Sequence, residues 1–380
     1  MENSIPKQSF FKKHFTGRRG SEFRMALLMG GPAFLLLLLF MIWPFIRGIE
    51  LSRTNQRFDG SEASSVGWEN YERILGVGIT SLPPVPDTFP DGRPSVGWYE
   101  NDGNVEWRWR TRAVDDLNEI QDGLERWRDY EILDIVRIGD NNYALMTRDP
   151  TFWRALRNNF MFAAFVVPIQ TALALFLAIL INQKLPYVNV FRTMYFSPVV
   201  TAMVIIAVVW SFLYNPQFGL INEMIGVFGL GPYDWLQDSQ SALPAIVIMS
   251  IWQGVGFQMI IFLAGLQDIP EDLYEAAGID GASIWQKFRF VTLPMLRNTL
   301  IFVVLTTTIL AFRLFDQVNV MTPDGGPAES TATMVWYAIR RGWSQGEIGY
   351  ATAISVVFVL IVLAISLVQR VVVRSESALD

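Results

Sequence analysis

The residues of this chain that could carry chemistry are few, and most are amides, hydroxyls and isolated charges inside apolar segments. Cysteine is absent, and the single histidine, His14, lies among lysines and arginines near the start of the chain. We therefore expect no thiol nucleophile, no thiolate or histidine metal site, no catalytic triad and no disulfide framework. The sequence also lacks a G-x-x-x-x-G-K-[S/T] phosphate loop, so we do not expect this chain to hydrolyse a nucleotide.

One group of polar residues lies in an apolar run that starts at Ala242. Gln253 follows roughly 16 Å further along a helix, at about the midplane of a membrane. Amides flanked by aromatic rings suit a solute rich in hydroxyl groups, whereas the alternative is a hydrogen bond between neighbouring helices. The candidate pathway residues in this run are Trp252, Gln253, Gly256, Phe257 and Gln258.

A second group lies in the next apolar run. Arg313 and Asp316 are three residues apart, so on a continuous helix they would share a face and could form an ion pair. A role for the acid in a polar pathway is the alternative, and the neighbouring aromatic rings could stack or simply pack. The candidates here are Phe312, Phe315, Asp316 and Asn319.

These groups are positioned by long apolar segments. The 380 residues are 51% hydrophobic and only 17% charged, and the mean hydropathy is +0.29. Apolar runs of about 20 residues are long enough to cross a bilayer as helices. The pattern predicts an all-α polytopic membrane protein with about six transmembrane helices. The predicted spans are Met25–Ile46, Asn159–Ile181, Phe191–Tyr214, Ala242–Leu266, Thr299–Met321 and Tyr350–Val368.

The distribution of lysine and arginine predicts the orientation of these helices, because basic residues of short loops stay on the cytoplasmic side. Residues 215–241 contain no lysine or arginine, so we expect this loop outside. Both tails, residues 1–24 and 372–380, are then cytoplasmic, and residues 47–157 are extracytoplasmic. The basic residues that support this orientation are Lys7, Lys12, Lys13, Arg18, Arg19, Arg24, Lys184, Arg192, Lys287, Arg289, Arg297, Arg370 and Arg374; Arg340 and Arg341 oppose it.

The predicted cytoplasmic loop at residues 267–297 contains two short helices. Pro270 and the acids after it are typical of a helix start, and Gly278 is expected to end or kink that helix. A second helix is predicted over Ser283–Phe290. Small residues between the two would let a partner surface approach the backbone closely. A pair of helices that merely caps the membrane bundle is the alternative.

Three motifs of the chain resemble those of bacterial ABC-importer permeases for carbohydrates, of the MalF type. The segment from Glu275 to Ala282, followed by Leu293-Pro294, is similar to the EAA loop of that family. The others are Val66-Gly67-Trp68-Glu69-Asn70-Tyr71, with Asp149-Pro150 and Phe152-Trp153 before the second span, and Leu314-Phe315-Asp316 with Val320-Met321-Thr322, Gly325-Gly326-Pro327 and Ser330-Thr331. The resemblance covers nearly the whole chain except residues 76–147.

The resemblance implies an ABC permease domain at residues 158–371 in a bacterial or archaeal cytoplasmic membrane. Its expected partners are a second permease subunit, two ATPase subunits that bind ATP and Mg, an extracytoplasmic solute-binding protein, a sugar or polyol substrate and the lipid bilayer. No cofactor on this chain, no enzyme activity and no nucleic acid are implied. The residues carried over as the ATPase-coupling segment are Glu275, Ala276, Ala277, Gly278, Asp280, Gly281 and Ala282.

The insert at residues 76–147 departs from the family pattern. It is predicted either to cap the outer side or to dock a soluble partner, since tryptophan and arginine are enriched at interfaces. Two other functions are alternatives for the chain as a whole. A secondary transporter predicts inverted repeats with matching broken helices, which the sequence does not show. A membrane enzyme predicts clustered catalytic residues, which are also absent from the sequence.

Overall fold

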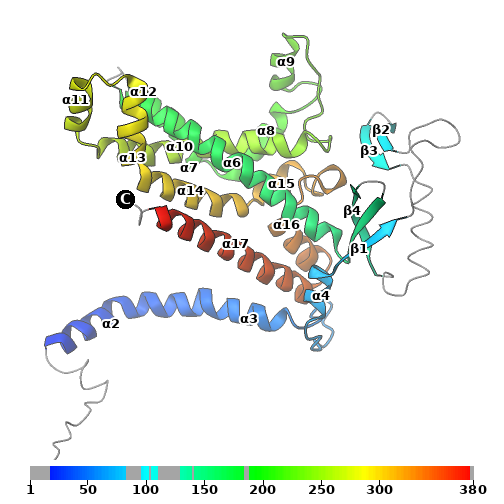
Figure 1. Ribbon diagram of the computed structural model, residues 1–380. Helices are drawn as coiled ribbons and strands as arrows, with labels where there is room; N and C mark the ends of the chain where they lie inside the picture. Colours follow the sequence, from blue (N-terminus) through cyan, green and yellow to red (C-terminus); the bar gives the residue numbers. More distant parts are fainter. Residues whose placement is uncertain are drawn as a thin grey trace, which may run out of the picture.

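The computed structural model describes residues 18–82, 96–101, 104–109, 129–138, 141–183 and 188–376, and most of these are helical (Figure 1). Of the basic positions used to predict the orientation, Lys7, Lys12, Lys13 and Lys184 lie outside the described residues. The elements are α2 (Arg18–Leu37), η1 (Leu38–Ile42), α3 (Trp43–Leu51), α4 (Glu69–Leu75), β1 (Val77–Leu82), β2 (Val96–Asn101), β3 (Asn104–Trp109), β4 (Glu131–Ile138), β5 (Asn141–Thr147), α6 (Pro150–Asn182), α7 (Val188–Val200), α8 (Met203–Leu213), α9 (Leu220–Gly226), α10 (Ala242–Gln267), α11 (Glu271–Ile279), α12 (Ile284–Lys287), η3 (Phe288–Thr292), α13 (Leu293–Met295), α14 (Arg297–Phe312), α15 (Asp316–Met321), η4 (Pro327–Glu329), α16 (Met334–Ile339), η5 (Arg340–Ser344) and α17 (Ile348–Glu376).

The described residues contain five helices long and apolar enough to cross a membrane, or six if one bent pair is counted as a span. The five are Leu28–Leu51, Pro150–Asn182, Ala242–Gln267, Arg297–Met321 and Ile348–Arg370. Each overlaps a run predicted from the sequence.

The third predicted span, Phe191–Tyr214, is not one straight helix. It consists of α7 and α8, which meet at an angle of 99°. Pro198 lies within α7, whereas the break falls at Ala202, which is extended with φ −58° and ψ 132°. The Ala202 carbonyl accepts hydrogen bonds from the backbone N–H groups of Ile205 and Ile206, so it starts a new helix in a new direction.

The insert contributes strands that the all-α prediction did not include. β1, β5 and β4 form an antiparallel sheet in the order β1-β5-β4, and β2 pairs with β3 in a hairpin. In β5, Ala144 and Met146 are buried while Tyr143 and Leu145 are only partly buried, which is the two-residue alternation of a strand with one covered face. The strand runs directly into the start of α6.

Asp149 joins the insert to the helical bundle. Its Oδ1 accepts a hydrogen bond of 2.9 Å from the Phe152 N–H and so caps α6. Its Oδ2 accepts from the Tyr337 hydroxyl at 2.6 Å and also from the Tyr350 hydroxyl. The Arg341 Nε donates to the Tyr337 oxygen at 2.8 Å. One buried carboxylate therefore fixes α6, α16 and α17 against one another.

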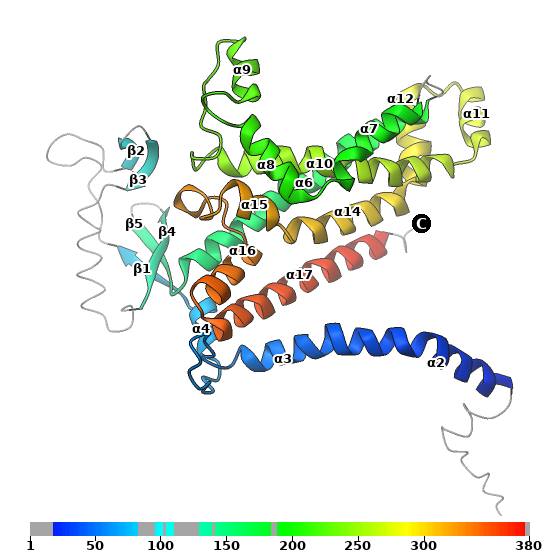
Figure 2. The same cartoon turned by 180° about the vertical axis from the view of Figure 1, so that it is seen from behind.

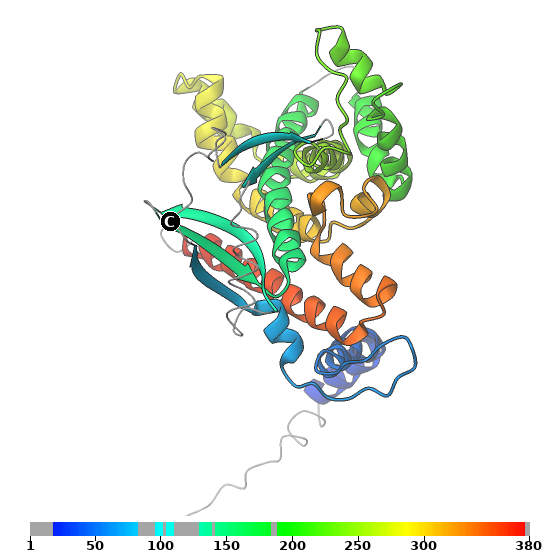
Figure 3. The ribbon, with the colours of Figure 1, turned by 90° about the vertical axis from the view of Figure 1, so that its right-hand side faces the viewer.

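The long helices run between two ends of the molecule, and the shorter elements gather at one end or the other. The start of α2, the α11–α12 segment and the end of α17 lie at one end, and the two sheets, α4 and α9 lie at the other (Figures 1 and 2). A view from the sheet end shows α2 and α3 at the edge of the bundle, away from α10 (Figure 3). The core between the ends is formed largely by α6 packed along α10, where small residues such as Ala174 and Ala178 are fully buried.

Candidate functional site

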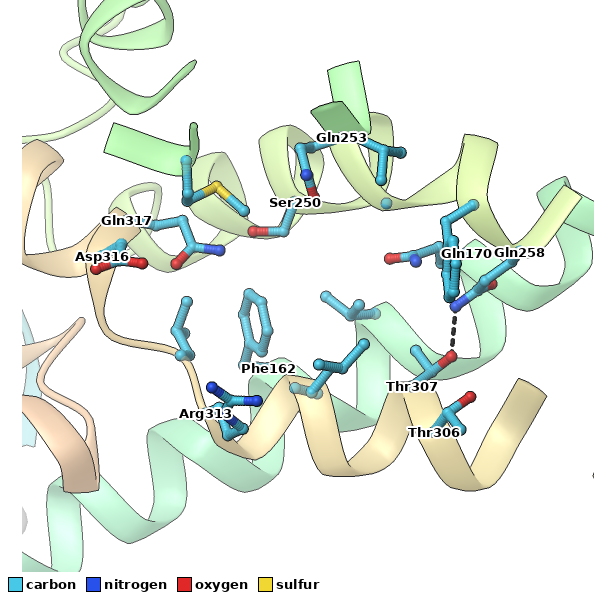
Figure 4. A pocket seen from close by; sticks show the side chains of 18 residues that line it. Phe162, Gln170, Ser250, Gln253, Gln258, Thr306, Thr307, Arg313, Asp316 and Gln317 are labelled. Atoms are coloured by element: carbon cyan, nitrogen blue, oxygen red, sulfur yellow. Dashed lines mark hydrogen bonds between the residues drawn. The ribbon is translucent and has the colours of Figure 1, made fainter. Parts of the chain in front are cut away.

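A cavity of about 340 Å³ lies between α6, α10, α14 and α15, in the middle of the bundle (Figure 4). Most of its wall comes from helices that could span a membrane. Its lining residues are Phe162, Val166 and Gln170 of α6, Val199 and Met203 of the bent pair, Ser250, Gln253, Gly254, Phe257 and Gln258 of α10, Thr306, Thr307, Leu310 and Ala311 of α14, and Arg313, Leu314, Asp316 and Gln317 around the start of α15.

Amide and hydroxyl groups give this cavity its chemistry. The Gln258 Nε2 donates a hydrogen bond to the Thr307 Oγ1, and the Thr307 hydroxyl donates to the Val303 carbonyl at 2.6 Å. The Gln258 Oε1 and the Ser250 Oγ are buried with no hydrogen-bond partner within the described part of the chain. Buried polar groups without partners are costly. Such groups on the wall of a cavity are suited to bind the hydroxyls of a solute.

Gln170 is a cavity residue that the sequence analysis did not select. It is buried, and its amide lies so close to Gly254 that a Cβ there would be 2.5 Å from the Gln170 Nε2. The glycine therefore leaves room for the glutamine side chain. Gln170 could have been found from the sequence, since it is an amide inside the second apolar run. Strongly polar residues in membrane helices usually face a cavity or a partner.

The charged residues of the cavity are at one end, near Gln317, while Gln170, Gln258 and Thr307 are at the other (Figure 4). The predicted pairing of Arg313 with Asp316 is wrong for this structure. α14 ends at Phe312 and α15 begins at Asp316, so the two residues do not share a helix face. The ion pairs between described residues do not include them.

The structure brings together four of the nine predicted pathway residues on the cavity wall, namely Gln253, Phe257, Gln258 and Asp316. The other five lie elsewhere. Trp252 lines a second cavity, on the α7–α8 side, and its ring centroid is 5.5 Å from that of Trp210. Phe312 is buried and packs edge-on against Phe160.

Three predicted pathway residues remain. Gly256 lies where α7 crosses α10, and a Cβ there would be only 1.8 Å from the Tyr195 carbonyl oxygen. Phe315 is partly buried in the break between α14 and α15, and Asn319 is exposed on α15. Because none of the three lines the main cavity, their direct contact with a solute stays a prediction.

The predicted coupling segment is an exposed pair of short helices. α11 begins after Pro270 and ends at Ile279, so Gly278 does not end it. The turn comes three residues after Gly278, where Gly281 has a φ of +75°. The Ser283 and Gln286 side chains form a capping box at the start of α12. The predicted second helix continues beyond α12 as a π-helical turn, η3, and then α13.

Two isoleucines at the tip of this segment were missed by the sequence analysis. Ile279 is 88% exposed and Ile284 is 89% exposed. Glu275, Ala276, Gly278, Asp280 and Gly281 are exposed as well, while Ala277 and Ala282 are partly buried. The Tyr274 hydroxyl lies 2.9 Å from the Thr292 Oγ1 and so ties α11 to η3. The tip is thus an apolar surface on a fixed support, which is the form expected of a docking element.

The family description "Binding-protein-dependent transport system inner membrane component" matches residues 147–377. Among relatives, the lactose transport system permease protein LacF of Rhizobium radiobacter is 38% identical, with 63% of this chain and 81% of LacF covered. The trehalose/maltose transport system permease protein MalF of Thermococcus litoralis is 35% identical, with 62% and 80% covered.

Two solved structures are also similar. One chain of a bacterial ABC transporter involved in the import of the acidic polysaccharide alginate covers 94% of this chain and 99% of its own length, with a TM-score of 0.64 and 18% identity. A second alginate transporter structure, in complex with a periplasmic protein that holds an alginate pentasaccharide, has a TM-score of 0.54 and 25% identity. It covers 58% of this chain and 78% of its own. The first likeness shows the fold.

Proposed function

Because this chain belongs to the family of binding-protein-dependent transport system inner membrane components, we propose that it is a permease subunit of an ATP-driven sugar importer. Family membership confirms the resemblance seen in the sequence and the location in the cytoplasmic membrane. The substrate is an oligosaccharide, a disaccharide or a related polyol, and a solute-binding protein delivers it. ATP and Mg are bound by separate ATPase subunits.

The observation that carries this proposal is the exposed α11–α12 tip. Ile279 and Ile284 are almost fully exposed. They lie at the end of the molecule where α2 starts and α17 ends. We assign the segment Glu275–Ala282 to a groove on the ATPase partner, with the two isoleucines as its apolar contacts. The small residues of the segment let the groove approach the backbone.

The cavity supports a sugar as substrate. Its four glutamines and its hydroxyl groups can donate and accept hydrogen bonds at the same time, as sugar hydroxyls require. LacF and MalF, which are similar to this chain, carry the names of lactose and of trehalose/maltose systems. We assign the contacts to Gln253, Phe257, Gln258 and Asp316, together with Gln170 and Ser250. The other predicted residues, Trp252, Gly256, Phe312, Phe315 and Asn319, shape the surrounding walls.

The orientation belongs to the same proposal. The α2 start, the coupling segment and the α17 end lie together on the cytoplasmic side, and the insert and α9 lie outside. The permease pairs with a second permease of different sequence. Of the two roles considered for the insert, a cap or a docking surface, we favour docking of the solute-binding protein, because a similar transporter is found in complex with a periplasmic protein.

The proposal is tested by purifying the tagged protein from gently solubilised membranes and identifying the subunits that remain bound. We expect a second permease, a P-loop ATPase and, in the presence of sugar, a binding protein. Replacing both Ile279 and Ile284 by serine should release the ATPase but leave the second permease bound. A control is Phe58→Ser, which changes an apolar residue that is 56% exposed at the other end. Purification of the chain alone, in every detergent tried, would contradict the proposal.

A further inference from the structure

The connection between α8 and α10, residues 215–241, forms a projecting arm that the mechanism above does not use. We call it the α9 arm. It leaves the end of α8 at a steep angle to the spanning helices and extends beyond them in all three views (Figures 1, 2 and 3). The arm is therefore directed sideways from the bundle.

The arm is held rigidly by one buried asparagine. Asn222 is 8% exposed, and its Nδ2 donates to the Tyr233 carbonyl at 2.9 Å. Its Oδ1 accepts from the Tyr233 N–H at 3.2 Å and from the Trp235 Nε1 at 3.0 Å. The Trp235 ring in turn lies 5.6 Å from the Tyr214 ring at the end of α8. A surface on this arm is ordered before any partner binds, which lowers the entropic cost of binding.

The exposed face of α9 is an apolar stripe, which we define as Leu220, Met224 and Val227. These residues follow the i, i+4, i+7 spacing of one helix face and are 57%, 61% and 83% exposed. The opposite face carries Asn222 with Ile221 and Ile225 and turns towards the rest of the arm. A short helix that shows apolar anchors at this spacing is the form that binds in a hydrophobic groove of another protein.

We propose that the stripe docks on the outer part of the second permease subunit; this inference rests on the proposed function. The direction of the arm favours a neighbour in the membrane, because a soluble binding protein would approach along the spanning helices, beyond the sheets. The neighbouring helix α8, from which the arm leaves, also has an apolar face, where Ile205, Val209 and Phe212 are 58%, 50% and 62% exposed.

The charge of the arm favours a protein over lipid. It has no lysine or arginine; Glu223 is exposed next to Met224 on α9, and Asp234 is exposed elsewhere on the arm. Anionic lipid headgroups would repel these carboxylates, whereas a protein surface with basic residues around an apolar groove would be complementary to them. The arm thus links the two permeases at their outer ends, far from the coupling segment.

The test uses the absence of cysteine from the natural chain. In the purified complex, a Val227→Cys variant is labelled with benzophenone maleimide and irradiated, and the adduct is identified by mass spectrometry. We expect a crosslink to the second permease. The same label at Ile79, which is 66% exposed on β1, should give no such crosslink. Adducts with the binding protein or with lipid alone would overturn the inference and leave the proposed function standing.

A label at Val227 could itself disturb docking, so a second experiment places the label next to the stripe. With the label at Phe228→Cys, the added changes Leu220→Ser and Met224→Ser should lower the yield of the crosslink about tenfold, because two apolar anchors are lost. The amount of bound ATPase, measured in the same sample, should not change. An unaltered yield would overturn the inference. A purified complex without a second permease would overturn the proposed function itself.

Discussion

At the scale of single residues, the distinctive feature is polar side chains that are buried next to empty space. Gln258 satisfies its amide N–H by bonding to Thr307, yet its carbonyl oxygen has no partner among the described residues. From its sequence context this glutamine has two possible roles, a helix–helix hydrogen bond or a solute contact. The structure shows that the first is present, and the free oxygen leaves room for the second.

Replacing Gln258 by leucine should reduce sugar uptake about tenfold, since one lost hydrogen bond to a buried polar group costs about 1 to 3 kcal/mol. Uptake is measured in cells with the complete transporter and the sugar of the co-purified binding protein. The matched control is Gln237→Leu, at an exposed position of the α9 arm. Equal uptake by both variants would rule out a contact through Gln258.

Tyr337 should make stability sensitive to alkaline pH. Burial, and next the Asp149 carboxylate, raise the pKa of Tyr337 above its ordinary value of 10.0. Above pH 10 the unfolded chain loses this proton while the folded protein keeps it, so the free energy of unfolding falls as pH rises, by about 1.4 kcal/mol per pH unit. Below pH 10 this contribution is fully present.

The measurement is the pH dependence of unfolding in detergent for the wild type and for Tyr337→Phe. We expect the variant to be less stable by about 1 kcal/mol at pH 8, because it lacks the hydrogen bond to Asp149. Between pH 10 and 12 the wild type should lose this advantage. Parallel curves over that range would show that Tyr337 titrates normally.

At the scale of elements, the contacts between helices depend on glycines that a sequence pattern does not distinguish from ordinary ones. Gly254 makes room for the Gln170 amide, and Gly256 lets α7 cross α10 at backbone contact. Two nearby glycines can also kink a helix. α10 runs unbroken through both positions, so their role is close approach of neighbouring elements.

A Gly256→Ala change should lower the free energy of unfolding by about 2 kcal/mol, because the new Cβ would overlap the Tyr195 carbonyl and force α7 away from α10. The control is Gly30→Ala in α2, where nothing lies within 4 Å of the added carbon. That change should be neutral or stabilising, since alanine favours helix. The measurement is the midpoint of thermal unfolding of the two variants in the same detergent. Similar midpoints would show that α7 and α10 do not need a glycine at this position.

At the scale of the whole molecule, the two ends have different chemistry. One end presents the exposed α11–α12 tip, and the other presents the strands, the Asp149 hydrogen bonds and the α9 arm. The polar cavity lies between the two ends. Since α10 and α14 flank the tip in the chain and also line the cavity, a displacement of the tip would reach the cavity through these two helices. Each end can therefore serve a different partner.

The proposed orientation predicts opposite labelling of two single-cysteine variants. Ile79→Cys on β1 should react with a membrane-impermeant maleimide in intact spheroplasts. Asp268→Cys, at the end of α10 beside the coupling segment, should react only after the membrane is opened. The wild type, which has no cysteine, should not react at all. The reverse pattern would invert the topology.

The sequence by itself determined the features that depend on local order. Apolar runs must become helices in a bilayer, because the backbone has no other hydrogen-bond partners there. The spans, the start of α11 after Pro270 and the family could therefore be predicted from residues close together in the chain. Gln253 and Gln258 could be selected because amides are rare in such runs.

Only the tertiary structure decided which polar residues meet. The 99° bend at Ala202, the break after Phe312 and the burial of Gln170 beside Gly254 result from contacts between helices distant in sequence. The same applies to Phe312, which packs against Phe160 and does not line the cavity. Periodicity along one helix gives its faces, but a face becomes a cavity wall or a packed surface only when its neighbours are in place.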